Sequence, residues 1–267
     1  MECDVDRVLA DYDRIREEHR LSGLGELELV RTQEVLRRHL GPPAQRVLDV
    51  GGGTGVHARW LLEDGHSVHL VDLAPRHVDH AVSELGPSGL TAEVGDARQL
   101  SIPDNSGDAV LLLGPLYHLQ DADDRAAVLH EARRIVCPGG FVAVAAISRF
   151  ASLFDGLARG YLFDDEFASI VDRGLESGCH DNPDNRPQWF TTAYFHRPEE
   201  LVQEIEAVGL QLVGLVGIEG LAGWLPELEA RWNEDKDRAV IVESARRIEA
   251  EPALLGLSAH LLAVALG

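Results

Sequence analysis

The sequence has few of the features that mark secreted or membrane-embedded proteins. Its 267 residues include three cysteines, Cys3, Cys137 and Cys179, which lie far apart and form no C-x-x-C motif. This pattern predicts free thiols; neither a disulfide framework nor a metal site is indicated. No run of 18 apolar residues occurs, so no transmembrane helix is expected. The acidic start Met1–Asp4 has no apolar segment typical of a secretory signal, and we expect a cytoplasmic protein.

Positive charge is also scarce. Lys and Arg number 24 against 45 Asp and Glu, which gives a formal net charge of −21, and Lys236 is the only lysine. Such a surface repels the phosphates of nucleic acids and the headgroups of anionic membranes. We therefore expect neither a nucleic acid nor a membrane as a partner. The length and the 45% hydrophobic content suffice for one α/β core with a small appended lobe.

The most informative stretch spans residues 46–57. Val47, Leu48 and Val50 give the apolar run of a strand that is covered on both faces. A glycine-rich turn follows, in which the backbone can bend sharply and approach a ligand closely. The next residues begin a helix, whose first N–H groups are available to that ligand. The stretch predicts a ligand-binding strand–turn–helix unit.

The spacing of the glycines indicates which ligand is bound. Dinucleotide-binding turns read G-x-G-x-x-G, whereas Gly51, Gly53 and Gly55 give G-x-G-x-G, and Val56 stands where the last glycine would be. Asp49, at the end of the strand, would repel a pyrophosphate and suits a cationic group. A nucleotide-binding unit and an ordinary glycine-rich turn stay open as alternatives at this point.

Polar residues also follow the next predicted strands. Strand 66–72 ends at Asp72, whose carboxylate can accept hydrogen bonds from both hydroxyls of a ribose. Strand 90–94 leads into Asp96 and Ala97, and strand 108–114 leads into the run Gly-Pro-Leu-Tyr-His. The carboxyl ends of parallel strands lie at one edge of a sheet, so these residues are predicted to share one cleft.

This series of motifs resembles the class I S-adenosylmethionine (SAM) dependent methyltransferases, whose ligand carries an ammonium and a sulfonium. The resemblance covers about residues 45–147 and implies a Rossmann-like, doubly wound, seven-stranded α/β sheet with a C-terminal antiparallel strand. The Gly-Pro-Leu-Tyr-His run is similar to small-molecule enzymes related to the quinone-biosynthesis methyltransferases. Gly114 stands where adenine- and glutamine-specific enzymes carry Asn or Asp, which argues against those acceptors.

The resemblance also implies which residues hold SAM. The motif positions assign the ribose to Asp72 and the adenine to Asp96 with Ala97. Predicted N-terminal helices over residues 5–40 would pack over the cleft, where Tyr12, Arg20 and Arg31 are polar-tipped and Arg31 could pair with the methionine carboxylate. The predicted cofactor-binding set is Asp49, Gly51, Gly53, Gly55, Asp72, Leu73, Asp96, Ala97, Leu113, Tyr12 and Arg31.

We predict four regions along the chain. Residues 1–44 form an N-terminal helical cap, 45–147 the SAM-binding core, 148–197 an inserted lid, and 198–267 the remainder of the core. The 148–197 segment breaks the alternation of strands and helices and is rich in aromatic residues, which would line an apolar substrate pocket. A helical subdomain or a dimer surface is the alternative, and a homodimer stays open.

Methyl transfer is a direct displacement at carbon, so the protein chiefly aligns donor and acceptor. An acceptor hydroxyl or ammonium must also lose a proton, and a histidine suits this task. The predicted catalytic residues are His118, Tyr117 and His180. Further candidates are His196 as a base, Tyr194 to orient the acceptor, and Glu219 to hold a cationic substrate.

Together these patterns predict an enzyme that transfers a methyl group from SAM to O or N of a small apolar or aromatic metabolite. Two other functions are compatible with a glycine-rich strand–helix unit. The first is an NAD-type oxidoreductase, against which the glycine spacing and Asp49 argue. The second is a non-catalytic SAM-binding module, which the complete motif set and the aromatic segment disfavour.

Overall fold

The computed structural model describes residues 25–183, 186 and 189–267. Tyr12 and Arg20, which were predicted to close the cleft, lie outside these residues, as does the first part of the predicted helical cap. The second predicted N-terminal helix is present as α2 (Glu26–Arg37).

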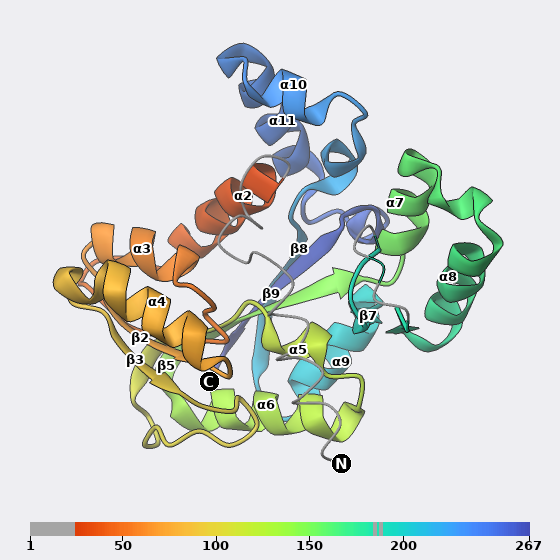
Figure 1. The fold of residues 1–267 in the computed structure, drawn as a ribbon. Helices are drawn as coiled ribbons and strands as arrows, with labels where there is room; N and C mark the ends of the chain where they lie inside the picture. The colour runs from red at the N-terminus through yellow and green to blue at the C-terminus, as the bar shows by residue number, and fades with distance from the viewer. Residues whose placement is uncertain (1–24, 184–185, 187–188) are drawn as a thin grey trace.

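A central sheet organises the chain (Figure 1). Five strands run parallel in the order β3-β2-β1-β4-β5. Their bounds are β1 (Arg46–Val50), β2 (Ser67–Asp72), β3 (Thr91–Val94), β4 (Gly107–Leu112) and β5 (Val136–Ser148). Parallel neighbours need crossover connections, and helices between the strands supply them, as the sequence pattern predicted.

Two further strands complete the main sheet. Strand β9 (His260–Leu266) pairs antiparallel with β5, and β8 (Gln211–Gly217) pairs antiparallel with β9. The resulting order β3-β2-β1-β4-β5-β9-β8 is the predicted seven-stranded sheet with a C-terminal antiparallel strand. A short antiparallel pair, β6 (Cys179–His180) and β7 (Ala193–His196), extends from the end of β5.

Helices cover both faces of the sheet and make two hydrophobic layers. Val47 and Leu111 point to the face covered by α2, α3 (Val56–Glu63) and α4 (Pro75–Leu85). Leu48 and Val110 point to the opposite face, which α6 (Ala122–Ile135) and α9 (Pro198–Ala207) cover. Because successive side chains of a strand alternate in direction, one apolar run serves both layers.

The remaining helices lie at the edges of this sandwich. Helices α7 (Ala151–Arg159) and α8 (Asp165–Ser177) lie together beyond the end of β5, while α10 (Leu228–Trp232) and α11 (Asp235–Ile248) lie next to α2 (Figure 1). Short α5 (Pro115–His118) follows β4. Within the described residues, no helix combines the length and apolarity needed to cross a bilayer.

The last strand begins later than the sequence indicated. The apolar pattern of residues 256–266 predicts one continuous final strand, but residues Leu255–Leu257 form a 3₁₀ turn and β9 starts at His260. His260 is in register with Ile147, near the end of β5. Because β9 runs antiparallel to β5, its first residue lies at the sheet edge where the parallel strands end. This edge is where ligands bind in open α/β sheets.

Candidate active site

The glycine-rich turn after β1 bends sharply, as its sequence predicted. Gly51, Gly53 and Gly55 have φ angles of 73°, 55° and 87°, a region that favours glycine. A Cβ at Gly51 would lie 2.6 Å from Cγ of Pro115, so the turn packs directly against the segment that follows β4. The turn and the end of β4 therefore form two adjacent walls at the carboxyl edge of the sheet.

Asp49 is a buried carboxylate under this turn. It is 1% exposed, and neither of its oxygens has a hydrogen-bond partner among the described residues. Burial, and then the neighbouring Asp72, raises the pKa of Asp49 to about 7. An unpaired buried carboxylate is unfavourable unless a cation or donor reaches it.

Asp72, at the end of β2, supports the turn from the other side. Its Oδ2 accepts a hydrogen bond from the Gly53 N–H at 2.8 Å, and its Oδ1 accepts one from the Ala74 N–H at 2.9 Å. His77 Nδ1 lies 3.1 Å from the same Oδ1. Asp72 therefore lies against the glycine turn, as the sequence predicted, and it also holds that turn in place.

Asp96 follows β3, but its carboxylate already has a partner. Arg98 donates to both carboxylate oxygens, from Nη2 at 2.7 Å and from Nε at 3.0 and 3.1 Å. Its Nη1 donates to Asp124 at 2.9 Å. Burial alone would raise the pKa of Asp96, but the hydrogen bonds from Arg98 outweigh it and hold the pKa below its ordinary value. The adenine contact predicted for Asp96 and Ala97 stays a prediction, and it would share oxygens with Arg98.

Arg31 does not take the role predicted for it. Its side chain is fully buried, and its guanidinium donates to Glu34, to Glu249 and to the carbonyl oxygen of Ile218. These contacts join α2 to the end of α11 and to the segment after β8, so its donors are committed there. The sequence pattern indicated a cleft arginine because it could not show which carboxylates fold against α2.

The segment after β4 carries two of the predicted catalytic residues. Tyr117 is 8% exposed and donates from its hydroxyl to the Leu113 carbonyl oxygen at 3.3 Å, while the His118 ring lies 4.7 Å from the Tyr117 ring. Tyr117 packs with Ile147 and Phe195. Leu113, like Leu73 after β2, is half-buried. Catalytic roles for Tyr117 and His118 stay predictions.

The predicted lid histidines are buried packing residues. His180 is 1% exposed, stacks on Phe195 at 4.9 Å, and lies 3.2 Å from Ser152 Oγ through Nδ1. Burial lowers the pKa of His180 to about 4, so the ring is neutral at physiological pH. His196 is fully buried and pairs with Glu204 at 3.2 Å, away from the pocket described next. The sequence prediction of His180 as a catalytic base is therefore not supported.

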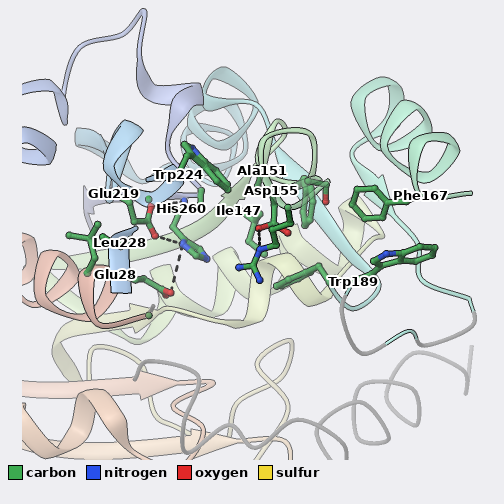
Figure 2. Close-up of a pocket in the computed structure, with 18 residues that line it drawn as sticks. Glu28, Ile147, Ala151, Asp155, Phe167, Trp189, Glu219, Trp224, Leu228 and His260 are labelled. Carbon is green, nitrogen blue, oxygen red and sulfur yellow. Dashed lines mark hydrogen bonds and ion pairs between the residues drawn. The ribbon is translucent and has the colours of Figure 1, made fainter. Parts of the chain in front are cut away.

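A pocket of about 410 Å³ opens beside the ends of β5, β8 and β9 (Figure 2). The segment 148–197 supplies one wall with Ala151, Ser152, Asp155, Arg159, Phe167, Trp189, Phe190 and Phe195. The opposite wall comes from α2 and the C-terminal part of the chain with Leu27, Glu28, Glu219, Trp224, Leu228 and His260. The prediction that aromatic residues of this segment line a pocket agrees with this geometry; an opening and closing lid stays a prediction.

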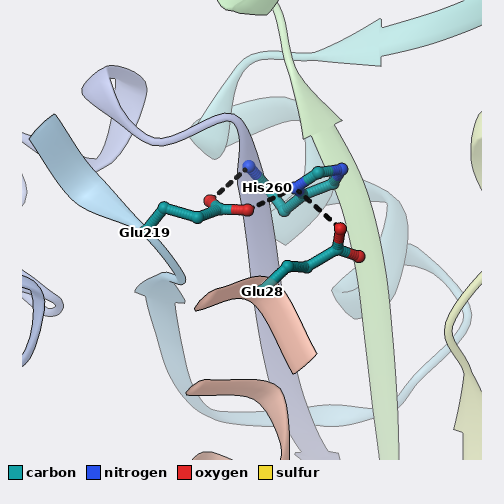
Figure 3. Close-up of side chains that lie close together, drawn as sticks. All are labelled: Glu28, Glu219 and His260. Carbon is teal, nitrogen blue, oxygen red and sulfur yellow. Dashed lines mark hydrogen bonds and ion pairs between the residues drawn. The ribbon is translucent and has the colours of Figure 1, made fainter. Parts of the chain in front are cut away.

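Three polar side chains meet at one end of this pocket (Figure 3). His260 Nδ1 lies 2.5 Å from Glu219 Oε1 and 3.8 Å from Glu28 Oε2. Ser258 donates from Oγ to Glu219 Oε2 at 2.7 Å, and the His260 N–H donates to the same oxygen at 3.1 Å. Glu219 was expected to hold a cationic substrate, but its oxygens are used by neighbouring residues.

Sequence reasoning missed His260 and Glu28. His260 was assigned to the interior of a strand, and Glu28 was one of several acidic residues on an amphipathic helix. One signal was available: in an antiparallel last strand, the first residues lie at the ligand-binding edge. Recognising the 3₁₀ turn over Leu255–Leu257 would have placed His260 there.

The comparisons with known proteins agree with this geometry. Residues 47–140, which run from β1 into β5, match the family model described as a methyltransferase domain. The chain therefore contains a segment that matches methyltransferase domains, and its fold is shared by solved SAM-dependent methyltransferases. The matched segment contains the glycine turn, Asp72 and Asp96, so the residues that carried the resemblance lie in the matched part.

Individual relatives resemble the chain over different lengths. A 2-methyl-6-phytyl-1,4-hydroquinone methyltransferase from Synechocystis is 40% identical over 107 residues, which is 39% of this chain and only 32% of that protein. A ubiquinone biosynthesis O-methyltransferase from Xanthomonas axonopodis is 29% identical and covers 69% of this chain and 70% of its own length. The N-methyltransferase NodS from Bradyrhizobium japonicum, solved with S-adenosyl-L-homocysteine, shares the fold at a TM-score of 0.58 and 15% identity, covering 99% of this chain and 98% of its own.

Proposed function

We propose that this protein transfers the methyl group of SAM to an oxygen or nitrogen of a small aromatic or apolar metabolite. The observation that carries the proposal is the buried Asp49 carboxylate, unpartnered among the described residues, beneath a glycine turn at the carboxyl edge of a parallel sheet. That arrangement suits a cationic ligand and is unfavourable for a pyrophosphate. The NAD-type alternative is disfavoured for the same reason.

The residues around the turn fit the parts of SAM. The backbone at Gly51–Gly53 has no side chains to obstruct a ligand, and Asp49 can balance the positive charge of an ammonium group. Asp72 ends the neighbouring strand β2, where a ribose would bind, and the half-buried Leu113 directly follows β4. SAM supplies an already activated methyl group, so the chain contributes binding, alignment and exclusion of water.

The pocket supports a compact acceptor. Its volume of about 410 Å³ suits a molecule of one or two rings, and Phe167, Trp189, Phe195 and Trp224 provide apolar walls. The relatives named for ubiquinone biosynthesis and for a phytyl hydroquinone support an aromatic acceptor that carries hydroxyl groups. An acceptor of this kind needs a base, because a neutral hydroxyl is a weak nucleophile.

Two measurements test the proposal. Isothermal titration calorimetry with SAM and with S-adenosyl-L-homocysteine should show binding to the wild-type chain and to Asp108→Ala. The Asp72→Ala variant should show a loss of at least about tenfold, because the acceptor for the Gly53 and Ala74 N–H groups is removed. Asp108 is the matched control, since it lies at the other end of the sheet and pairs with Arg46.

Transfer is then measured with SAM carrying a radioactive methyl group and a panel of phenols, hydroquinones, naphthols and arylamines. Methylation of ring hydroxyl or amine compounds is the expected result. Binding of NADH in place of SAM, or equal SAM affinity in Asp72→Ala and Asp108→Ala, would contradict the assignment. SAM binding without transfer to any compound of the panel would favour the non-catalytic module.

A further inference from the structure

We propose that Arg98 is a positioning residue for the nucleobase of the bound cofactor. It fixes the Asp96 carboxylate with one acceptor position left for the amino group of adenine, and the site therefore selects an amino-bearing base over a base with a carbonyl group. The inference rests on the proposed function, in which SAM binds at this edge of the sheet with its adenine at Asp96. It adds to that site a residue that the sequence prediction did not include.

Asp96 lies beside the residues that border the glycine turn. The N–H of the preceding residue, Gly95, donates to the carbonyl oxygen of Asp72 at 3.0 Å, and the carboxylate of Asp72 accepts from the Gly53 N–H at 2.8 Å. A Cβ at Gly95 would lie 2.8 Å from Val71 Cγ1, so the backbone before Asp96 packs closely against β2. An adenosine with its ribose at Asp72 can reach Asp96 with its base, because sugar and base are directly bonded.

Arg98 holds the Asp96 carboxylate with three N–H groups. Its backbone N–H donates to Oδ1 at 2.9 Å, and Nη2 donates to Oδ2 at 2.7 Å. Nε lies between the two oxygens, at 3.0 and 3.1 Å. Because the guanidinium is planar and rigid, this paired contact fixes the plane of the carboxylate as well as its position.

The Asp96 carboxylate can still accept one more hydrogen bond. Its two oxygens offer about four acceptor positions, and the three N–H groups of Arg98 use three of them. The Asp96 side chain is 36% exposed, so a ligand can reach the remaining position. The exocyclic amino group of adenine is a suitable donor. A ring carbonyl in the same place would bring an oxygen against an oxygen and make no hydrogen bond.

Arg98 is itself held by α6, which covers one face of the sheet (Figure 1). Its Nη1 donates to Asp124, in the first turn of that helix, at 2.9 Å. Two residues further along, the Leu100 N–H donates to Glu131 of α6 at 2.7 Å, and Arg134 of α6 donates to the Leu100 carbonyl oxygen at 3.2 Å. The segment that carries Asp96 is therefore attached to α6 at two places, and the guanidinium is oriented before a ligand binds.

The pairing with Arg98 also keeps Asp96 ionised. Burial alone would raise the pKa of Asp96, but the hydrogen bonds from Arg98 hold it below the ordinary value. Asp124 of α6 pairs with the other side of the same guanidinium. An ionised carboxylate accepts hydrogen bonds and cannot donate them, so it favours an amino group and disfavours a carbonyl throughout the physiological pH range.

Two matched ligands test this selectivity. S-adenosyl-L-homocysteine carries an amino group on its base, and S-inosyl-L-homocysteine carries a carbonyl in that position. In calorimetry, wild type should bind the adenosyl ligand about 10- to 100-fold more tightly, the range expected for a hydrogen bond to a charged group. The ratio of the two affinities should be constant from pH 8 to pH 5, because Asp96 stays ionised. Equal affinities, or a ratio that falls within this pH range, would overturn the proposal.

Variants of Arg98 distinguish positioning from a merely structural effect. In Arg98→Ala the ratio should fall by at least about fivefold through weaker adenosyl binding, while inosyl binding changes by less than about threefold. Arg98→Lys keeps a positive charge but lacks the planar pair of donors, so it should recover part of the ratio. Tighter adenosyl binding in Arg98→Ala would overturn the proposal, because Arg98 would then compete with the base for Asp96.

Two further variants serve as controls. Arg134→Ala removes a contact between α6 and the same segment but leaves the pair of Asp96 and Arg98, so any loss should be equal for both ligands. Asp96→Asn keeps the side-chain size and adds an amide donor, so the ratio should fall as it does in Arg98→Ala. A ratio that also falls in Arg134→Ala would assign the effect to loosening of the segment and overturn the proposal. An unchanged ratio in Asp96→Asn would overturn it as well.

These outcomes are distinguishable from a failure of the proposed function. If wild type binds neither ligand, the proposed function is wrong and this inference falls with it. If wild type binds both ligands equally, the cofactor site exists but Asp96 and Arg98 do not select its base, and only this inference fails. Selective binding that is reduced in Arg98→Ala and retained in Arg134→Ala is the expected result.

Discussion

Replacing Asp49 with asparagine should stabilise the ligand-free protein at neutral and alkaline pH. Asp49 is fully buried, neither oxygen has a partner among the described residues, and burial raises its pKa from 3.8 to about 7. Between pH 4 and 7 the folded state keeps a proton on Asp49 that the unfolded chain has lost. Stability therefore falls as pH rises through this window, and the loss is complete above the folded-state pKa.

The size of the effect follows from the two pKa values. A rise from 3.8 to about 7 corresponds to about 4 kcal/mol of unfolding free energy lost above pH 7. The asparagine side chain is neutral at every pH, so Asp49→Asn should be more stable than wild type by up to this amount at pH 8. For a chain of this length, the difference corresponds to a rise in Tm of about 10 °C. Near pH 4 the two proteins should have similar Tm values.

Thermal unfolding from pH 4 to 9, followed by calorimetry without SAM, measures this difference directly. Asp108→Asn is the control, because Arg46 holds the pKa of Asp108 below its ordinary value and its charge is constant over most of this range. Tm curves that run parallel for wild type and Asp49→Asn would refute the reasoning. Added SAM should raise Tm at pH 8 more in wild type than in Asp49→Asn, since only the wild-type protein offers a charge to the ammonium group.

Four further predictions concern individual residues. Gly51→Ala should destabilise the fold by about 1–3 kcal/mol in urea unfolding and weaken SAM binding, because φ is 73° and a Cβ would lie 2.6 Å from Pro115 Cγ; unchanged affinity would contradict this. Arg31→Met should lower the free energy of unfolding by about 3 kcal/mol in urea unfolding, because Glu34 and Glu249 each lose a partner. Its SAM affinity in calorimetry should be unchanged. His118→Ala should reduce turnover and keep SAM affinity, and equal turnover would exclude a direct role. His180→Phe should make the fold less sensitive to acid. In the wild type, the buried ring has a pKa of about 4 while the ring in the unfolded chain takes up a proton near pH 6.5, so lowering the pH favours unfolding. Identical acid-unfolding midpoints for the two proteins would contradict this prediction.

The sequence alone determined the sheet and predicted where on it a cofactor would bind. Both depend on short segments whose structure is set by residues adjacent in the sequence. These are a buried strand, a glycine turn that needs positive φ angles, and a carboxylate at the end of the next strand. The positions of Gly51, Asp49 and Asp72 at one edge of the sheet could be predicted because such motifs have the same geometry wherever parallel strands end at one edge; their contacts with a cofactor stay a prediction. The antiparallel last strand was also predicted, although its start was placed four residues too early.

Only the tertiary structure decided which polar residues face the pocket. Arg31 and His180 had the right chemistry for a site, but the fold buries Arg31 against Glu34 and Glu249, and stacks His180 on Phe195. Glu28 and His260 are separated by more than 230 residues and meet because α2 packs beside the first residue of β9. Contacts between distant segments depend on how helices cover the sheet edges, and no local pattern of residues encodes that packing.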